Sequence, residues 1–144
     1  MRPPFTVEEV RWADAAQALG AIRRTVFVVE QNVPEELEWD GVDPDCAHVL
    51  ARAADGTPIG TGRLLPDGHI GRMAVVEPWR RRGVGSALLV RLVEMARSRG
   101  FESVALNAQT YAIPFYRRHG FVAEGEEFIE AGIPHFAMVR LLRE

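Results

Sequence analysis

The sequence predicts an α/β (α+β) fold in which a mixed, mostly antiparallel sheet of six to seven strands carries helices on both faces. Three short apolar runs separated by turn signals indicate consecutive strands, and a long segment with one apolar stripe indicates a helix that packs on them. Strand and helix patterns then alternate to the end of the chain. With 144 residues, 47% of them hydrophobic and 26% charged, the chain is expected to form one domain over residues 1–144.

The N-terminal third is expected to contain a strand, a helix and an acidic loop. Residues 5–10 form the strand, and Asp14 is placed to cap the helix that follows. Apolar side chains recur in this helix at three- and four-residue spacing, namely Ala15, Leu19, Ile22, Val26 and Phe27. The acidic residues over 33–45 indicate either a solvated loop or the rim of a pocket that favours a cationic amine.

Three strands are predicted next, over residues 48–53, 58–65 and 70–76. The sequences Asp55-Gly56 and Pro66-Asp67-Gly68 between them are turn signals. Strands joined by such short turns pair with their neighbours in opposite directions, so we expect an antiparallel meander.

The long helix is predicted over residues 83–99, with Gly100 placed to end it. Its apolar stripe consists of Val84, Leu88, Leu92, Met95 and Ala96. A buried strand over 103–106 follows, so this helix joins two strands that are most simply parallel.

The last part of the chain is expected to add a short helix and two strands. The helix covers residues 113–119 and is stopped by Gly120. One strand starts at residues 121–123, and the other covers residues 135–142. These elements complete the expected sheet.

Composition excludes several classes of function. A net charge of −3 argues against general affinity for nucleic acid or anionic membranes. The single cysteine, Cys46, cannot form an internal disulfide, which favours a cytoplasmic location, and we expect an inert thiol. No segment approaches the roughly 20 apolar residues of a membrane span, and the first residues, MRPPFTVEEVRW, lack the apolar core of a signal peptide.

A cluster of positive charge lies where the long helix is expected to begin. The cluster and its glycines are Arg80, Arg81, Arg82, Gly83, Val84, Gly85 and Ser86. Arginines are unfavourable at the positive end of a helix dipole, unless an anion binds there to the unpaired backbone N–H groups. Gly83 and Gly85 would let a bulky anion approach the backbone, and Ser86 could add a hydroxyl donor.

A phosphate or pyrophosphate is therefore the expected ligand of this turn, and a solvated basic turn is the alternative. Two known phosphate loops are excluded. The turn has no Gly-Lys-Ser/Thr of a nucleotide triphosphatase. It also has Leu88 where a dinucleotide-binding loop needs its third glycine.

Two blocks of the sequence resemble the GNAT acetyltransferases. Residues 80–85, after Met73-Ala74-Val75-Val76, resemble the acetyl-coenzyme-A signature of that family, Arg/Gln-x-x-Gly-x-Gly/Ala. Residues 105–109, followed by 115–121, resemble its second characteristic block. Residues 24–31 with Asp40, Asp43 and His48, and also residues 132–135, are similar to the ElaA-like and YjcF-like branch. The resemblance covers nearly the whole chain and implies the GNAT fold, with strands splayed at the coenzyme site.

The resemblance also implies how acetyl-coenzyme A would bind as cosubstrate. The turn at residues 80–86 would hold the pyrophosphate, and the main chain of Met73, Ala74 and Val75 would pair with the pantetheine arm. A backbone N–H near Val75 would stabilise the oxyanion. Asn107 would contact the pantetheine or a water molecule, with a strand-end cap as its alternative.

The resemblance implies direct attack by a primary amine of a small molecule or a protein, without an acyl-enzyme. Tyr116 is the candidate general acid, and the alternative is that it only packs beside Phe115. Glu30 is the first candidate for the base, because partial burial after an apolar run would raise its pKa. Gln31, His48 and His135 are candidate substrate-binding residues, the histidines also being weaker candidates for the base. No metal is implied, since the histidines and acids lack a recognisable ligand spacing.

Two other functions are considered. A non-catalytic acyl-coenzyme-A sensor would use the same anion-binding turn without an acid or a base. An acyl-homoserine-lactone synthase would share the Arg-x-x-Val-Phe start, but those enzymes are longer and lack the Arg-x-x-Gly-x-Gly turn. The expected partners are acetyl-coenzyme A and an unidentified amine, and a second copy could pair at a sheet edge to form a homodimer.

Overall fold

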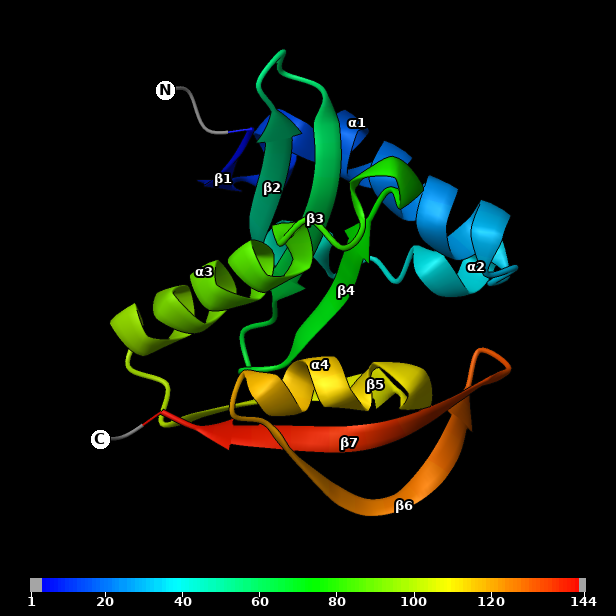
Figure 1. The fold of residues 1–144 in the computed structure, drawn as a ribbon, viewed down its shortest axis with the longest axis vertical. Helices are drawn as coiled ribbons and strands as arrows, with labels where there is room; N and C mark the ends of the chain where they lie inside the picture. Colours follow the sequence, from blue (N-terminus) through cyan, green and yellow to red (C-terminus); the bar gives the residue numbers. More distant parts are fainter. Residues whose placement is uncertain (1–3, 143–144) are drawn as a thin grey trace.

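Two antiparallel sheets form the framework of the computed structural model, which describes residues 4–142 (Figure 1). The first sheet has the order β1-β2-β3-β4 and consists of β1 (Phe5–Val10), β2 (Ala47–Ala53), β3 (Pro58–Leu64) and β4 (Ile70–Val75). The second sheet has the order β5-β7-β6 and consists of β5 (Ser103–Gln109), β6 (Val122–Glu130) and β7 (Ile133–Leu141). The predicted α/β fold and its antiparallel meander are confirmed, and β1 extends the meander by pairing with β2.

The two sheets meet at a single point. His69 and Ala105 form one parallel bridge, and the Ala105 N–H donates to the carbonyl of Gly68 at 3.2 Å. The predicted parallel pairing of β4 with β5 is therefore limited to this bridge, and the expected single sheet is divided in two. A bulge contributes to the separation, because the register of β3 against β4 shifts near Arg72, whose φ is +51°. A bulge bends and twists its strand, which turns β4 away from β5.

Helices cover both faces of the first sheet. On one face, Leu50 and Ala74 pack against α1 (Trp12–Arg23), which continues as a π-helical segment, η1 (Arg24–Glu30). On the other face, Val49 and Ala51 belong to the core that contains α3 (Val84–Ser98). Neighbouring residues of a strand point to opposite faces, so β2 contributes side chains to both cores.

The glycines of β3 allow α3 to lie close to the sheet. A Cβ atom on Gly62 would be 2.8 Å from Leu92 Cδ1, and one on Gly60 would be 3.0 Å from Leu88 Cδ1. Both leucines are fully buried, as is most of the predicted stripe of α3. Each such leucine contributes about 1.5–3 kcal/mol relative to an exposed one.

Short helical elements fill the connections. They are α2 (Glu35–Glu38), η2 (Asp43–Asp45), η3 (Glu77–Trp79), η4 (Thr110–Ala112) and α4 (Ile113–Arg118). The expected cap at Asp14 is wrong: α1 begins at Trp12, and Asp14 lies in the first turn, where it accepts a hydrogen bond from Arg11. Gly100 and Gly120 follow α3 and α4 with φ near +85°, as predicted for residues that end helices. In the part of the chain that the structure describes, no helix is long and apolar enough to cross a membrane.

Candidate active site

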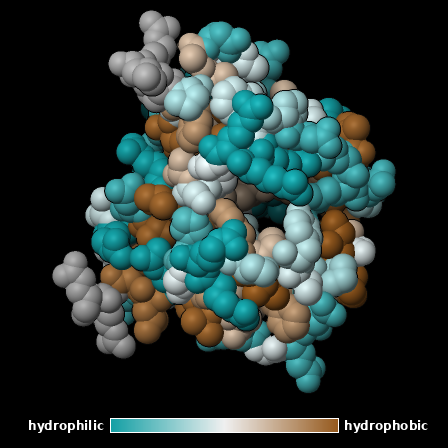
Figure 2. Space-filling model, viewed as in Figure 1, coloured by the Kyte–Doolittle hydropathy of each residue, from teal (hydrophilic) through white to brown (hydrophobic). Residues whose placement is uncertain are grey.

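A cleft of about 920 Å³ lies between the two sheets, where β4 and β5 diverge. Figure 2 shows the molecule hollowed near its centre. One wall comes from η1, α2 and β4, and the other from β5 and from the ends of β6 and β7 that face it. The cleft thus occupies the gap that an undivided sheet would have closed.

The edge of β4 that faces the cleft carries backbone groups that do not pair with a neighbouring strand. The Val76 N–H donates to the carbonyl of Ile59 in β3 at 3.0 Å, so the backbone groups of Val76 point toward β3. Backbone groups alternate in direction along a strand, so those of Val75 point to the opposite edge. There the Val75 carbonyl accepts a hydrogen bond from Arg80 Nε at 2.9 Å, which leaves the Val75 N–H on the cleft side. Met73 and Ala74 line the cleft beside it.

The arginine and glycine turn lines the cleft with Arg80 and Arg81 only, and residues 82–86 are not part of the lining. Gly83 immediately precedes α3 with a φ of +85°, and Arg81 has a φ of +64°. The hydrogen bonds of α3 begin with the Ala87 N–H donating to the Gly83 carbonyl at 3.0 Å. The N–H groups of the first turn therefore have no acceptor within the helix.

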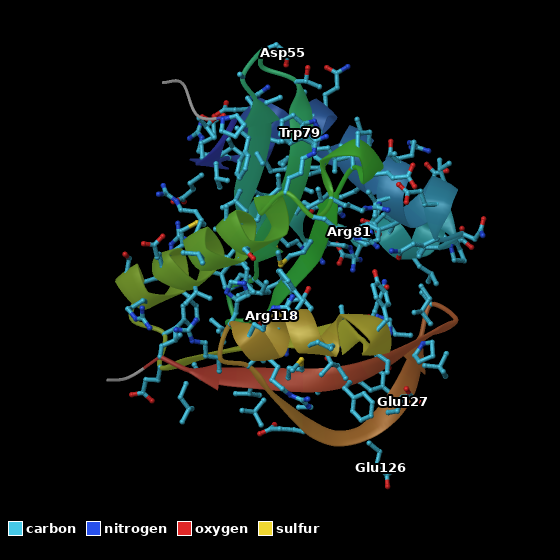
Figure 3. All side chains as sticks on the ribbon, in the orientation of Figure 1. Asp55, Trp79, Arg81, Arg118, Glu126 and Glu127 are labelled. Atoms are coloured by element: carbon cyan, nitrogen blue, oxygen red, sulfur yellow. The ribbon has the colours of Figure 1, made fainter. Side chains whose placement is uncertain are left out.

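The residues of this turn have separate surroundings. Arg80 binds Glu30 at 2.8 Å, and the Arg82 guanidinium lies 5.1 Å from the centre of the Trp79 ring. Arg81 lines the cleft, and Figure 3 shows it beside β4. Ser86 does not line the cleft, because its hydroxyl is hydrogen-bonded to His119 at 3.0 Å. The structure thus brings Arg80 and Arg81 to the cleft and directs Ser86 to α4.

Tyr116 extends from α4 into the cleft. Its hydroxyl lies 3.9 Å from the sulfur of Met73, and its ring packs edge-on against Phe115 and Phe121. Burial raises the pKa of this phenol to about 12. The hydroxyl is therefore protonated throughout the physiological pH range and can act as a hydrogen-bond donor next to β4.

Two expectations about titratable residues are wrong. Glu30 was expected to be partly buried, but it is exposed at the end of η1 and forms an ion pair with Arg80. His48 was expected at the substrate pocket, but it is 1% exposed, lies outside the cleft and stacks on Trp12. Its Nε2 lies 2.9 Å from the Asp43 carbonyl, and burial lowers the pKa of its imidazole.

The wall formed by the second sheet is polar. Gln31 Oε1 accepts a hydrogen bond from Gln109 Nε2 at 2.9 Å, which links η1 to β5 across the cleft. The Asn107 amide donates to Glu130 Oε1 at 3.3 Å. His135 lines the same wall and is 6% exposed. The sequence prediction included Gln31, Asn107 and His135 but missed Gln109 and Glu130, for which it offered no signal.

A buried ionic network supports the opposite wall. Arg23, which is 1% exposed, donates to Glu38 Oε2 and to Asp43 Oδ1, both at 2.7 Å. Arg63 donates to Asp43 at 2.9 Å and to Asp40 at 2.6 Å. The hydrogen bond from Arg63 lowers the pKa of Asp40 to about 2. Burial would raise the pKa of Asp43, but the hydrogen bonds and charges of the two arginines outweigh burial and lower it.

This network bears on both interpretations of the acidic residues over 33–45, as a solvated loop or as the rim of a pocket that favours a cationic amine. Asp43 is buried, so the segment is not simply a solvated loop, and the charge of Glu38 on the cleft wall is compensated by Arg23 and Arg72. The sequence carried one overlooked signal. Arg23 lies four residues after Leu19 and three before Val26, which places it on the apolar stripe of α1.

The remaining reactive side chains give no sign of other chemistry. Cys46 is half-buried, its thiol contacts the Val42 carbonyl at 3.3 Å, and burial raises the pKa of the thiol. A thiol with a raised pKa is a poor nucleophile at neutral pH. Among residues 4–142, no three His, Cys, Asp or Glu side chains gather as they would around a metal ion.

Two sheets that diverge from one bridge around a cleft, which is lined by the open edge of β4 and by Arg80 and Arg81, define an acyltransferase of the GNAT fold. The chain belongs to the GNAT acetyltransferase family, since the model of the acetyltransferase (GNAT) domain matches residues 5–142. The predicted membership of this family is thereby confirmed.

Individual proteins support the same assignment. The uncharacterized N-acetyltransferase YjcF of Bacillus subtilis is 39% identical over 123 residues, which cover 83% of this chain and 87% of YjcF. An acyl-CoA N-acyltransferase from Pseudomonas aeruginosa superposes with a TM-score of 0.84 at 34% identity, covering 94% of this chain and 99% of that one. Escherichia coli ElaA gives a TM-score of 0.84 at 31% identity with the same coverage. The predicted ElaA-like and YjcF-like branch is also confirmed.

Proposed function

We propose that this enzyme transfers an acetyl group from acetyl-coenzyme A to a primary amine of a small molecule or a protein. The amine nitrogen attacks the thioester carbon directly, so that a C–N bond forms and the C–S bond breaks. The observation that carries the proposal is the free edge of β4, where the Val75 N–H faces a cleft that Arg80 and Arg81 also line. A fixed N–H on this edge is suited to stabilise the oxyanion of the tetrahedral intermediate.

The N-terminus of α3 is the proposed site for the pyrophosphate of the cosubstrate. The unpaired N–H groups and the helix dipole of the first turn both attract an anion. Arg81 adds a positive charge at the same end of the cleft. Residues 73–75 would pair with the pantetheine arm through their backbone, and Asn107 faces that strand from β5.

Tyr116 is the proposed partner of the departing sulfur. Because its pKa is about 12, its hydroxyl keeps its proton before the reaction. A thiol has an ordinary pKa of about 8.5, so complete transfer of the phenolic proton to the thiolate is uphill. We therefore assign to Tyr116 a hydrogen bond that stabilises the thiolate as the C–S bond breaks, with solvent supplying the proton.

Thiol release is the direct test of the proposed function. The protein is incubated with acetyl-coenzyme A and a panel of primary amines, including polyamines, lysine and lysine-containing peptides, and free thiol is followed with a chromogenic disulfide. Amine-dependent release of thiol is expected. Binding of acetyl-coenzyme A by calorimetry without release for any amine would instead support a non-catalytic sensor.

Replacing Tyr116 by phenylalanine is expected to lower kcat about 10-fold, since a hydrogen bond to a charged group contributes about 1.5 kcal/mol or more. Binding of acetyl-coenzyme A should be nearly normal, because the aromatic packing against Phe115 and Phe121 is retained. Steady-state kinetics and calorimetry measure the two quantities. Tyr111→Phe provides the comparison, because Tyr111 also lines the cleft but is 78% exposed, and it should lower kcat less than Tyr116→Phe does. An unchanged kcat in Tyr116→Phe would remove this residue from the mechanism.

A homodimer is a separate prediction. The free edges that a second copy could pair with are β1 in the first sheet and β6 in the second.

A further inference from the structure

We propose that His135 is the general base that removes a proton from the acceptor amine, and that Glu130 is the residue that positions it. This inference rests on the proposed function and specifies how its acceptor is activated. The acceptor then approaches between η1 and the connection of β6 to β7, on the side of the cleft where these residues lie. It replaces the earlier candidate Glu30, which is exposed and paired with Arg80.

The hydrogen bonding of His135 fixes which ring nitrogen is basic. Nδ1 lies 2.7 Å from the carbonyl oxygen of Ile133, which can only accept, so Nδ1 carries the hydrogen. In the neutral ring the lone pair is therefore on Nε2. The ring is held in place by stacking on Phe128, with centroids 5.9 Å apart. A buried imidazole of fixed orientation thus presents its basic nitrogen at the cleft wall.

Strand alternation places His135 and Tyr116 on opposite sides of the second sheet. His135 is paired with Gln109 in the register of β7 against β5, so both side chains lie on the same face. Leu106 and Ala108 alternate with Gln109 and point into the core, which Tyr116 packs against. The base and the hydrogen-bond donor would therefore act from two sides of the acyl group, as an attacking amine and a leaving thiolate require.

Glu130 is the charged group nearest to the imidazole. Its Oε2 lies 3.8 Å from His135 Nε2, and its Oε1 accepts the hydrogen bond from Asn107. The carboxylate stabilises the imidazolium that forms when His135 takes up the amine proton. A cationic acceptor gives one proton to His135 before the attack, so that its nitrogen has a free lone pair, and it loses a second proton as the C–N bond forms. Each proton passes from His135 to solvent, so the ring is regenerated.

The charged side chains on the other walls of the cleft form ion pairs with residues other than His135, or lie far from it. On the facing wall, Arg63 and Arg72 are paired with Asp40, and Glu38 is paired with Arg23. At the far end, Arg80 is paired with Glu30, and Arg81 lies at the proposed pyrophosphate site. Glu130 is therefore the carboxylate that remains beside His135, and it also favours the approach of a cationic amine.

The sharpest test is His135→Asn. The amide nitrogen of asparagine can keep the hydrogen bond to the Ile133 carbonyl, whereas the basic nitrogen is lost. We expect kcat/KM for the best amine of the thiol assay to fall by about 100-fold or more at pH 7, within the usual range for general-base catalysis. Binding of acetyl-coenzyme A, measured by calorimetry, should stay within about threefold of the wild type.

The pH profile separates a base from a structural role. In the wild type, kcat/KM should fall at acidic pH as His135 becomes protonated and then level off above that step. In His135→Asn, this step should be absent, and kcat/KM should keep rising with pH as the free acceptor loses its own proton. Glu130→Gln should keep the step, because His135 is retained, but should lower kcat/KM above it, because the neutral amide no longer stabilises the imidazolium that forms during the reaction.

His69→Gln is the matched control, since His69 is the other histidine that lines the cleft, and its exposed ring is engaged by Asp67 rather than directed at His135. This variant should have the kinetics of the wild type. Activity of His135→Asn within threefold of the wild type, or an acidic step that survives in it, would overturn the assignment of His135 alone. Absence of amine-dependent thiol release from the wild type would overturn the proposed function and this inference together.

Discussion

Replacing Arg23 by methionine is expected to lower the free energy of unfolding by about 3–5 kcal/mol, the usual cost of removing one partner from a buried ion pair. The guanidinium is 1% exposed and bridges Glu38 and Asp43. Methionine fills similar space but leaves Glu38 buried with only Arg72 beside it. Urea denaturation followed by circular dichroism measures the difference.

Two further variants show that the effect comes from buried charge. Arg99→Met removes an exposed ion pair with Glu9 and should cost about 0–1 kcal/mol. The double variant Arg23→Met/Glu38→Met should recover part of the stability lost in the single variant, because it removes the unpaired carboxylate. A cost for Arg23→Met no larger than that for Arg99→Met would contradict the assigned role of the network.

Replacing Gly83 and Gly85 together by valine is expected to weaken binding of acetyl-coenzyme A at least about 100-fold. A Cβ on Gly83 would meet no protein atom within 4 Å, so it would project into the open space in front of the turn, and glycines at such sites let an anion approach the backbone. A Cβ on Gly85 would lie 3.5 Å from Phe115, an ordinary contact, so the packing there need not change. Calorimetry with coenzyme A measures the loss.

A second glycine, which follows α3, provides the control for backbone strain. Gly100 follows α3 with a φ of +83°, close to the +85° of Gly83, and its Cβ would also meet nothing within 4 Å. Gly83→Ala and Gly100→Ala should therefore cost similar stability, about 1–2 kcal/mol each, but only Gly83→Ala should weaken binding. Equal affinities in these two variants, or retained affinity in the double valine variant, would show that the pyrophosphate is held elsewhere.

Much of the fold could be predicted because its elements depend on local patterns. The stripe of α3, the turns at Asp55-Gly56 and Pro66-Asp67-Gly68, and the glycines that follow α3 and α4 are all encoded within a few residues. The division into two sheets could not be predicted in this way. It depends on a bulge in the pairing of β3 with β4 near Arg72, and on a bridge between His69 and Ala105, which lie more than 30 residues apart.

The candidate site, too, could be predicted from the sequence only in part. Residues 73–75, Arg80, Arg81 and Tyr116 line the cleft, whereas residues 82–85 of the same motif do not, so their part in binding stays a prediction. The motifs gave no guide to which acid or histidine reaches the cleft. Glu30 and His48 were misplaced, since a single side chain is directed by its tertiary neighbours, which are Arg80 for the first and Trp12 and Asp43 for the second.

The sequence by itself determined the family, the order of the elements and the turn proposed to bind the anion, because short-range periodicity and backbone chemistry specify these. Only the tertiary structure decided that Arg23 neutralises a buried pair of acids and that His135 presents its Nε2 beside Glu130. The physical reason is that burial and electrostatic pairing act between residues distant along the chain. Neither quantity exists until the strands and helices have packed.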